Sequence, residues 1–230
     1  LSVTSIGKYA FSMCSSLLEI TIPSSVTSIG KYAFSKCSSL LVISIPSSVN
    51  LIDDYSFCEC TSLKEISIPS SVTSIGNYSF MKCLSLTQIS IPSSVKIIGN
   101  HVFDGCLSLT QITLPSSIEM FGENIFNDIV SLKIKGDIEV IPDNLFKGCS
   151  SLTKISLSSS VKYIKNYAFS GCSSLKQLSI HSSVISFGNY VFDGCSSLAQ
   201  ITIPSSIKEF GENIFNGVVS LEIKGDIEVI

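Results

Sequence analysis

Phenylalanine recurs at a fixed interval along this chain, and that interval is the strongest constraint on its fold. Successive phenylalanines of this series are 23 residues apart from Phe11 to Phe126 and again from Phe146 to Phe215. The step from Phe126 to Phe146 is 20 residues. Ten repeats can be counted in this way. A unit of this length cannot bury both of its sides alone, so successive units must stack with equivalent residues above one another. The sequence therefore predicts a solenoid.

Each repeat contains two different hydrophobic spacings. In the repeat that begins at Leu17, two isoleucines alternate with polar residues, as in a half-buried strand, and Pro23 ends the strand because it has no N–H to donate. The next hydrophobic residues have the spacing of a helical or short 3₁₀ turn: Ile29, Ala33, Phe34 and Cys37. We expect the strands of neighbouring coils to pair in parallel about 4.8 Å apart.

The chain also repeats on a longer scale. Residues 115–141 and 204–230 are nearly identical, and shortened coils are expected near 127–146 and 216–230. We expect residues 1–230 to form a single solenoid domain. Because neither end carries a polar capping unit, which solenoids need for solubility, this domain is interpreted as a fragment of a longer array.

Composition excludes several classes of function. Charged residues make up 14% of the 230 residues, and all fifteen basic residues are lysine. Without arginine the chain lacks the planar fork that reads guanine edges and clamps phosphates, so nucleic acid is not an expected partner. No apolar run approaches the roughly 18 to 20 residues needed to cross a bilayer, so we expect no membrane insertion by this segment.

Cysteine is the most conspicuous candidate for chemistry, with nine residues. Eight of them recur at the same place in successive coils: Cys14, Cys37, Cys60, Cys83, Cys106, Cys149, Cys172 and Cys195. Stacking should arrange them in a column, which suits neither convergence on a metal nor ideal disulfide geometry. Ile129 and Val218 replace cysteine in this column, so we interpret it as a row of small buried hydrophobes with free thiols. Cys58 lies outside the column and is expected to face solvent.

No catalytic residue, metal site or cofactor is predicted. His101 has Asp104 three residues further on, whereas His181 takes a turn position held elsewhere by proline. Glu19 and Glu65 stand at equivalent strand positions two coils apart, roughly 10 Å, too far for a retaining pair of carboxylates. The tripeptide that begins at Asn77 is the only glycosylation sequon, and it matters only on a secretory route.

The exposed face of the long sheet is the predicted binding surface. Between the two isoleucines of each strand stands a hydroxyl column: Thr21, Ser44, Ser67, Ser90, Thr113, Ser156, Ser179 and Thr202. Beside it runs a second, largely amide column: Glu19, Val42, Glu65, Gln88, Gln111, Lys154, Gln177 and Gln200. This face is flat and free of aromatic anchors, so one segment should bind weakly and depend on multivalency. The alternative is that these residues only solvate the sheet.

Tyrosines recur next to the Ala-Phe pair and suggest a second binding edge: Tyr9, Tyr32, Tyr55, Tyr78, Tyr167 and Tyr190. They lie on a different part of each repeat from the two columns of the sheet.

The repeat Leu-x-x-Ile-x-Ile-Pro-x-x-Val-x-x-Ile-Gly-x-x-Ala-Phe-x-x-Cys resembles the leucine-rich repeats of the BspA-like family over the whole chain. The resemblance implies an α/β leucine-rich repeat solenoid. We expect a right-handed superhelix of about ten coils, with a parallel sheet on one face and short 3₁₀ or helical turns on the other. Ser158 and His181 replace the proline of the pattern, and Asp53 and Lys165 its glycine, changes that a turn tolerates.

What the family implies for function is a non-enzymatic protein at the cell surface or outside the cell that adheres to host cells or to matrix proteins such as fibronectin. An alternative from another class is a structural scaffold that self-associates weakly through neutral ladders and coil ends. Light scattering across concentrations should distinguish the two.

Overall fold

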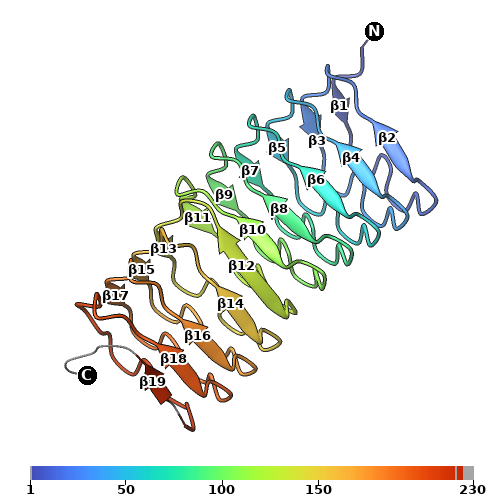
Figure 1. Cartoon of the computed structure of the whole chain (residues 1–230). Helices are drawn as coiled ribbons and strands as arrows, with labels where there is room; N and C mark the ends of the chain where they lie inside the picture. Colours follow the sequence, from blue (N-terminus) through green and yellow to red (C-terminus); the bar gives the residue numbers. More distant parts are fainter. Residues whose placement is uncertain (1, 221, 225–230) are drawn as a thin grey trace.

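The computed structural model describes residues 2–220 and 222–224, which wind into about nine stacked turns (Figure 1). This is fewer than the ten predicted, because that count included the incomplete repeats at the two ends of the sequence. Each turn except the last described one contributes one longer and one shorter strand, and the turns stack along one axis. The result is an elongated body with two rows of parallel strands along its length.

The longer strands form the predicted parallel sheet, which we call the long-strand sheet. Its members are β2 (Glu19–Thr21), β4 (Val42–Ser44), β6 (Glu65–Ser67), β8 (Gln88–Ser90), β10 (Gln111–Thr113), β12 (Ser131–Lys135), β14 (Lys154–Ser156), β16 (Gln177–Ser179), β18 (Gln200–Thr202) and β19 (Glu222–Lys224). Hydrogen bonding divides it into β2-β4-β6 and β8 to β19, and β6 lies against β8. In the three-residue strands from β4 to β18 the central side chain is buried in the core, because side chains alternate along a strand.

A second row of strands was not predicted. It contains β1 (Ser5–Ile6), β3 (Ser28–Ile29), β5 (Leu51–Ile52), β7 (Ser74–Ile75), β9 (Ile97–Ile98), β11 (Met120–Phe121), β13 (Val140–Ile141), β15 (Tyr163–Ile164) and β17 (Ser186–Phe187). These two-residue strands also pair in parallel, as β1 to β11 and β13 to β17. The prediction of a sheet on one face only is therefore wrong. Two residues are too few to show an alternating hydrophobic pattern in the sequence.

The predicted helical or 3₁₀ turns are absent from the described residues, which form hydrogen-bonded turns without helices. At the Ala-Phe corner, alternate N–H groups have different partners: Ser35 donates back to Tyr32 at 3.2 Å, but Phe34 donates to Ser56 of the next turn at 2.8 Å. Tyr32 and Lys36 adopt left-handed backbone angles, with φ of 60° and 62°. A helix needs consecutive right-handed residues with internal bonds, so these reversals prevent one.

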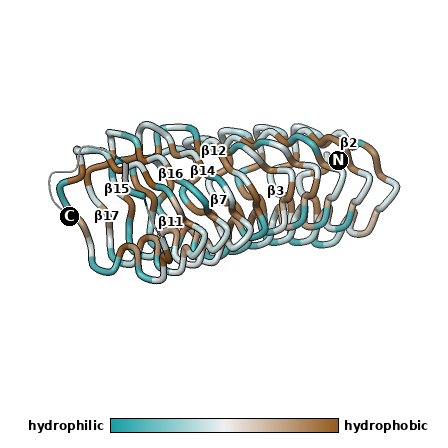
Figure 2. The backbone as a smooth tube through the Cα atoms, turned by 60° about the horizontal axis from the view of Figure 1, so that its bottom comes forward, coloured by the Kyte–Doolittle hydropathy of each residue, from teal (hydrophilic) through white to brown (hydrophobic). Residues whose placement is uncertain are grey.

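The core is a set of side-chain columns that run through all the turns. Consecutive phenylalanine rings from Phe11 to Phe215 are stacked with centroids 5.1 to 5.9 Å apart. Figure 2 shows hydrophobic segments recurring at the same places in successive turns. Because each ring packs between two others, the interior is continuous along the axis, as the period predicts.

The strand register slips by two residues at β12, the strand of the shortened turn. Lys133 pairs with Gln111 on one side and with Ser156 on the other. By the count of repeats, however, Gln111 is equivalent to Lys154 and not to Ser156. A slip of two residues keeps the same side chains facing outward, because the side-chain period of a strand is two. The sheet therefore continues across the shortened turn with a displaced pattern of exposed residues.

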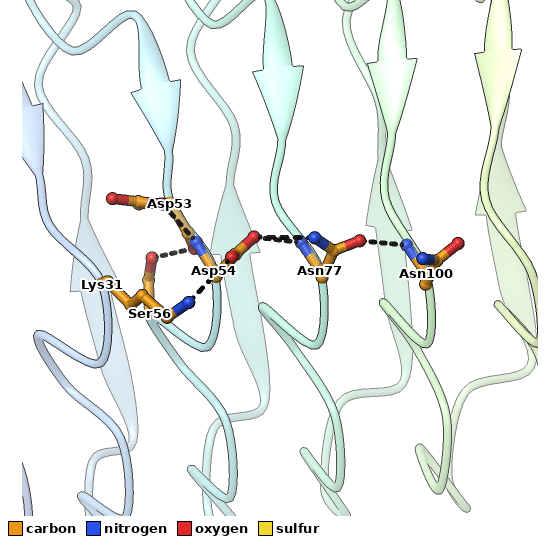
Figure 3. A network of polar contacts seen from close by, with 6 residues as sticks. All are labelled: Lys31, Asp53, Asp54, Ser56, Asn77 and Asn100. Atoms are coloured by element: carbon orange, nitrogen blue, oxygen red, sulfur yellow. Dashed lines mark hydrogen bonds and ion pairs between the residues drawn. The ribbon is translucent and has the colours of Figure 1, made fainter.

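A ladder of side-chain amides and carboxylates ties the turns together at the end of the short strands (Figure 3). Asp54 Oδ1 accepts the backbone N–H of Asn77, Asn77 Oδ1 that of Asn100, and Asn100 Oδ1 that of Glu123, each at 2.8 Å. Lys31 Nζ lies 3.1 Å from Asp54 Oδ2 and extends the ladder by an ion pair. A second ladder follows further along the chain: Asp143, Asn166, Asn189 and Glu212.

The sequence contains a signal for this ladder that the spacing of hydrophobic residues does not reveal. The pair Gly-Asn recurs at Asn77, Asn100 and Asn189, one repeat or whole repeats apart. Serines such as Ser25 recur at the other end of the turn. In the structure Ser25 Oγ donates to the carbonyl oxygen of Val3 at 2.6 Å, so both positions satisfy backbone groups between turns.

Candidate binding surface

The first half of the long-strand sheet presents the two predicted columns in register. Glu19, Val42 and Glu65 pair directly across β2, β4 and β6, and Gln88 pairs with Gln111 across β8 and β10. The hydroxyl column beside them is formed in the same way: Thr21, Ser44 and Ser67, then Ser90 and Thr113. These side chains are exposed, except that Gln111 and Thr113 are half-buried next to the longer β12.

A shallow depression of about 620 Å³ lies on this face across β4, β6, β8 and β10. Glu65, Gln88 and Gln111 line it on one side, and Ser67 and Ser90 on the other. Gln111 Nε2 approaches Gln88 Oε1 at 3.5 Å. The lining thus combines hydroxyls and amides, which can both donate and accept hydrogen bonds, with a single carboxylate.

The slip at β12 breaks both predicted columns, which corrects the expectation of two continuous rows. Lys133 and Lys135 stand beside Gln111 and Thr113, and Ser131 stands beside Lys154. Beyond the slip, the columns resume with their predicted members: Lys154, Gln177 and Gln200, and Ser156, Ser179 and Thr202. All the predicted surface residues lie on one sheet, but the row that contains Gln111 continues into Ser156 rather than Lys154. Lys133 and Lys135 were missed because the repeat alignment has no place for them.

The tyrosines form stacks whose rings cover one another. Tyr9, Tyr32, Tyr55 and Tyr78 are stacked with ring centroids 4.4 to 4.8 Å apart, and His101 continues the stack at 4.7 Å from Tyr78. A second stack joins two further tyrosines, Tyr167 and Tyr190, at 5.0 Å. Only ring edges and hydroxyls remain for a partner along such a stack. The second binding edge stays a prediction.

The two histidines lie in separate local networks. His101 Nδ1 is 2.8 Å from Asp104 Oδ2, and His181 Nδ1 accepts the backbone N–H of Ser183 at 3.1 Å. Glu19 and Glu65 lie on β2 and β6 with Val42 between them. Within the described part of the chain, no group of three or more His, Cys, Asp or Glu side chains could hold a metal ion. No helix in that part is long and apolar enough to span a membrane.

The cysteine column has the predicted position but a different exposed member. All nine cysteines are free thiols, and Cys14 is the exposed one. Seven column thiols are buried and donate to the carbonyl oxygen of a phenylalanine in the preceding turn, at 3.1 to 3.4 Å. The prediction that Cys58 faces solvent is wrong, since its side chain is 5% exposed. Cys58 occupies the same place as Ser35 and Ser170, which are also buried, so this position faces the packed corner.

The buried thiols should make the protein less stable at alkaline pH. Burial raises the pKa of Cys37 and Cys58 to about 11 and that of Cys106 and Cys149 to about 12, whereas a free thiol ionises near 9. The stability that the protonated thiols contribute is therefore fully present below pH 9. It is lost as the pH rises toward the pKa values of the folded state, because only the unfolded chain releases these protons readily. Urea denaturation midpoints measured between pH 8 and about 10.5 should fall with increasing pH.

The Cys58→Ser variant is the matched control, because three other turns already carry serine at this position. Its midpoint should fall less steeply with pH than that of the original chain. Equal slopes for the two proteins would show that Cys58 ionises as freely in the folded state as in the unfolded one.

The glycosylation sequon is built into the ladder of the fold. Asn77 Nδ2 donates to Asp54 Oδ1 at 3.1 Å while Asn77 Oδ1 accepts from Asn100. Ser79, the third residue of the sequon, is fully buried. The atom that would carry a glycan is thus engaged in a contact between turns.

Comparisons with known proteins agree with this architecture. The BspA type leucine-rich repeat region, in six copies, matches residues 4–133 and 127–224. A search of curated proteins finds no match. Among solved structures, the T. pallidum leucine-rich repeat protein TpLRR is 29% identical with a TM-score of 0.56, over 84% of this chain and 82% of that one.

Two further solved structures share the fold. The pneumococcal vaccine antigen PcpA is 22% identical with a TM-score of 0.54, over 98% of this chain and 74% of its own. A leucine-rich repeat protein from Eubacterium ventriosum is 21% identical with a TM-score of 0.53, over 94% and 80%. Because the family match covers most of the repeats, the chain belongs to the BspA-type leucine-rich repeat family.

Proposed function

We propose that this chain is a non-enzymatic protein displayed at the cell surface, where it adheres to host cells or to extracellular matrix through its long-strand sheet. Proteins of the BspA-type repeat family are generally protein-interaction scaffolds, which supports a binding role. The resemblance to BspA-like surface proteins supports the location and the class of partner. Fibronectin is the first matrix protein to test on the same ground.

The observation that carries the proposal is the uncovered outer side of the long-strand sheet. Side chains such as Ser67, Gln88 and Ser90 are exposed on it, although the inner side of the same strands is buried. Strands in a parallel sheet are usually covered on both faces, and an open face with regularly spaced polar groups is available to a partner. The depression around Gln88 and Gln111 adds a concave area to this surface.

The purified chain should bind to immobilised fibronectin or to cultured host cells in a saturable way, and two charged substitutions in the depression should weaken that binding. The change is Ser90→Glu with Gln111→Lys, which alters both columns without touching the core. Because single sheet contacts are weak, we expect a loss of about tenfold in affinity, measured by surface plasmon resonance and by cell-binding assays.

A double variant in the turns after the long strands, Ser70→Glu with Ser93→Glu, is the control, since both serines are exposed outside the sheet. It should bind as the original chain does. Failure of the original chain to bind any matrix protein or host cell would overturn the adhesion proposal. In that event, a molar mass that rises with concentration in light scattering would favour the self-associating scaffold instead.

A further inference from the structure

We propose that three lysines on the long-strand sheet, Lys133, Lys135 and Lys154, form a site for an extended acidic segment of a partner protein. We call these three residues the lysine patch. The inference rests on the proposed function for the choice of a protein as partner, and it specifies the chemistry that the partner must present.

Two neighbouring strands, β12 and β14, carry the lysine patch. Lys133 and Lys135 project from the same face of β12, and Lys154 follows on β14, opposite Ser131. All three lysines are exposed, and none has an ion-pair partner among the described residues. Three lysines elsewhere, Lys31, Lys96 and Lys162, lie 3.1, 3.3 and 2.7 Å from carboxylate oxygens.

The spacing of the patch fits an extended peptide. Residues two apart on a strand lie about 6.6 to 6.8 Å from each other on one face, and an extended peptide presents alternate side chains at the same interval. Carboxylates at alternate positions of a peptide that lies along β12 can therefore meet Lys133 and Lys135 together. Lys154 stands on the adjacent strand opposite Ser131, so it can meet a third acidic group one alternate position before the group at Lys133.

The charge of the surrounding sheet favours an anionic partner. Strands β8 to β18 contain no aspartate or glutamate, although the whole chain has a net charge of −3. The nearest carboxylate along the chain, Asp137, lies beyond the end of β12 and accepts hydrogen bonds from Ser116 at 2.8 and 3.0 Å. Gln111, Ser131 and Ser156 flank the lysines and can form hydrogen bonds to a bound peptide backbone.

An exposed apolar row beside the patch favours a protein segment over a sulfated polysaccharide. Leu84, Leu107 and Val130 occupy equivalent places just before β8, β10 and β12, and their side chains are 38%, 55% and 48% exposed. An apolar side chain of the partner can cover this row, which a polysulfated sugar cannot do. The occupant is therefore a segment with alternating acidic residues next to an apolar residue.

The duplicated part of the chain supplies a matched pair of charge changes. Glu222 of the second copy stands where the first copy has Lys133, and its strand pairs with β18 just as β12 pairs with β10. Conversely, Glu119 of the first copy stands where the second has Lys208. Lys133→Glu and Lys208→Glu thus make the same change in charge, each to a residue that the other copy already accommodates. Only the first lies on the sheet.

The experiment measures binding of the full chain to a short synthetic peptide in which glutamate alternates with serine and leucine follows at one end. Lys133→Glu should weaken binding about tenfold, because it replaces an attraction with a repulsion, and Lys208→Glu should change it less than twofold. Leu107→Ser, which introduces the serine found in later turns, should weaken binding about threefold, with little dependence on salt. The matching peptide with glutamine should not bind.

Equal effects of the two lysine variants, or equal binding of the glutamine peptide, would overturn the lysine patch. So would Lys133-dependent binding of heparin with no binding of the glutamate peptide. If the peptide binds through Lys133 while host cells and matrix proteins do not bind at all, the patch stands and the adhesion proposal fails. If matrix binding is unchanged by Lys133→Glu, the adhesion proposal stands and the patch fails.

Discussion

Replacing Phe103 with alanine should lower the free energy of unfolding by about 3 to 5 kcal/mol. The ring is fully buried in the middle of the phenylalanine column, with centroids 5.8 Å from Phe80 and 5.9 Å from Phe126. Truncation removes its buried apolar surface and leaves a cavity between two rings. Since a solenoid is held together by contacts between neighbouring turns, loss of a central ring weakens two interfaces at once.

Urea denaturation followed by circular dichroism measures this loss, and tyrosine fluorescence tests whether the array unfolds as one unit. The control is Phe210→Ala, because Phe210 is 36% exposed and touches Phe187 only edge-on. We expect this control to lower the free energy of unfolding by about 1 kcal/mol. A similar cost for both variants would mean that the column contributes no more than surface packing does.

The core could be predicted because every repeat has hydrophobic residues at the same positions. Phe34, Cys37 and Leu40 return at the same spacing in almost every turn, and only stacking can bury so many equivalent hydrophobic residues. Alternation around Ile43 likewise identifies the long strands and their outward residues. These signals depend on side-chain spacing within one repeat, which the sequence displays directly.

The corners could not be predicted, since their conformation depends on the neighbouring turn. Ile29, Ala33 and Phe34 have helical spacing, but Phe34 donates its N–H to Ser56 of the next turn. Non-glycine residues such as Tyr32 take up left-handed angles there, which sequence patterns assign to glycine or asparagine. Bonding between turns thus overrides the local preference for a helix.

The candidate site shows the same division. Gln88, Ser90 and Gln111 could be placed on the sheet from alternation alone, and the structure finds them there. The lysine patch could not be found in this way, because the missing residues of the shortened turn can be absorbed at more than one point. Only the observed register places Lys133 beside Gln111. The observed register likewise places Lys154 beside Ser131 rather than beside Lys133.

We expect the turn after β12 to fix that slip, and replacing Gly136 with alanine should destabilise the protein by about 3 kcal/mol or more. Gly136 has a φ of 97°, and a Cβ atom there would lie 2.9 Å from the carbonyl carbon of Leu114 and closer still to its oxygen. Hydrogen bonds to the preceding and the following turn hold the backbone around Gly136. Leu114 donates its N–H to Lys135 at 2.9 Å, and Ser158 Oγ donates to the carbonyl oxygen of Gly136 at 2.6 Å.

The expected loss at Gly136 has two causes, the strain of a left-handed residue and the clash with Leu114. The variant Gly148→Ala separates them. Gly148 also has a positive φ, 75°, but a Cβ atom there would meet nothing within 4 Å. Gly148→Ala should therefore lower the free energy of unfolding by about 1 kcal/mol in the same urea experiment, which is the strain of a non-glycine residue in the left-handed conformation. The excess loss at Gly136 measures the contact with Leu114. Because the clash with Leu114 would displace β12 from β10, Gly136→Ala should also weaken binding of the glutamate peptide, whereas Gly148→Ala should not. Equal stability losses for the two variants would show that the backbone at β12 can move aside, and that the slip is not locked by this turn.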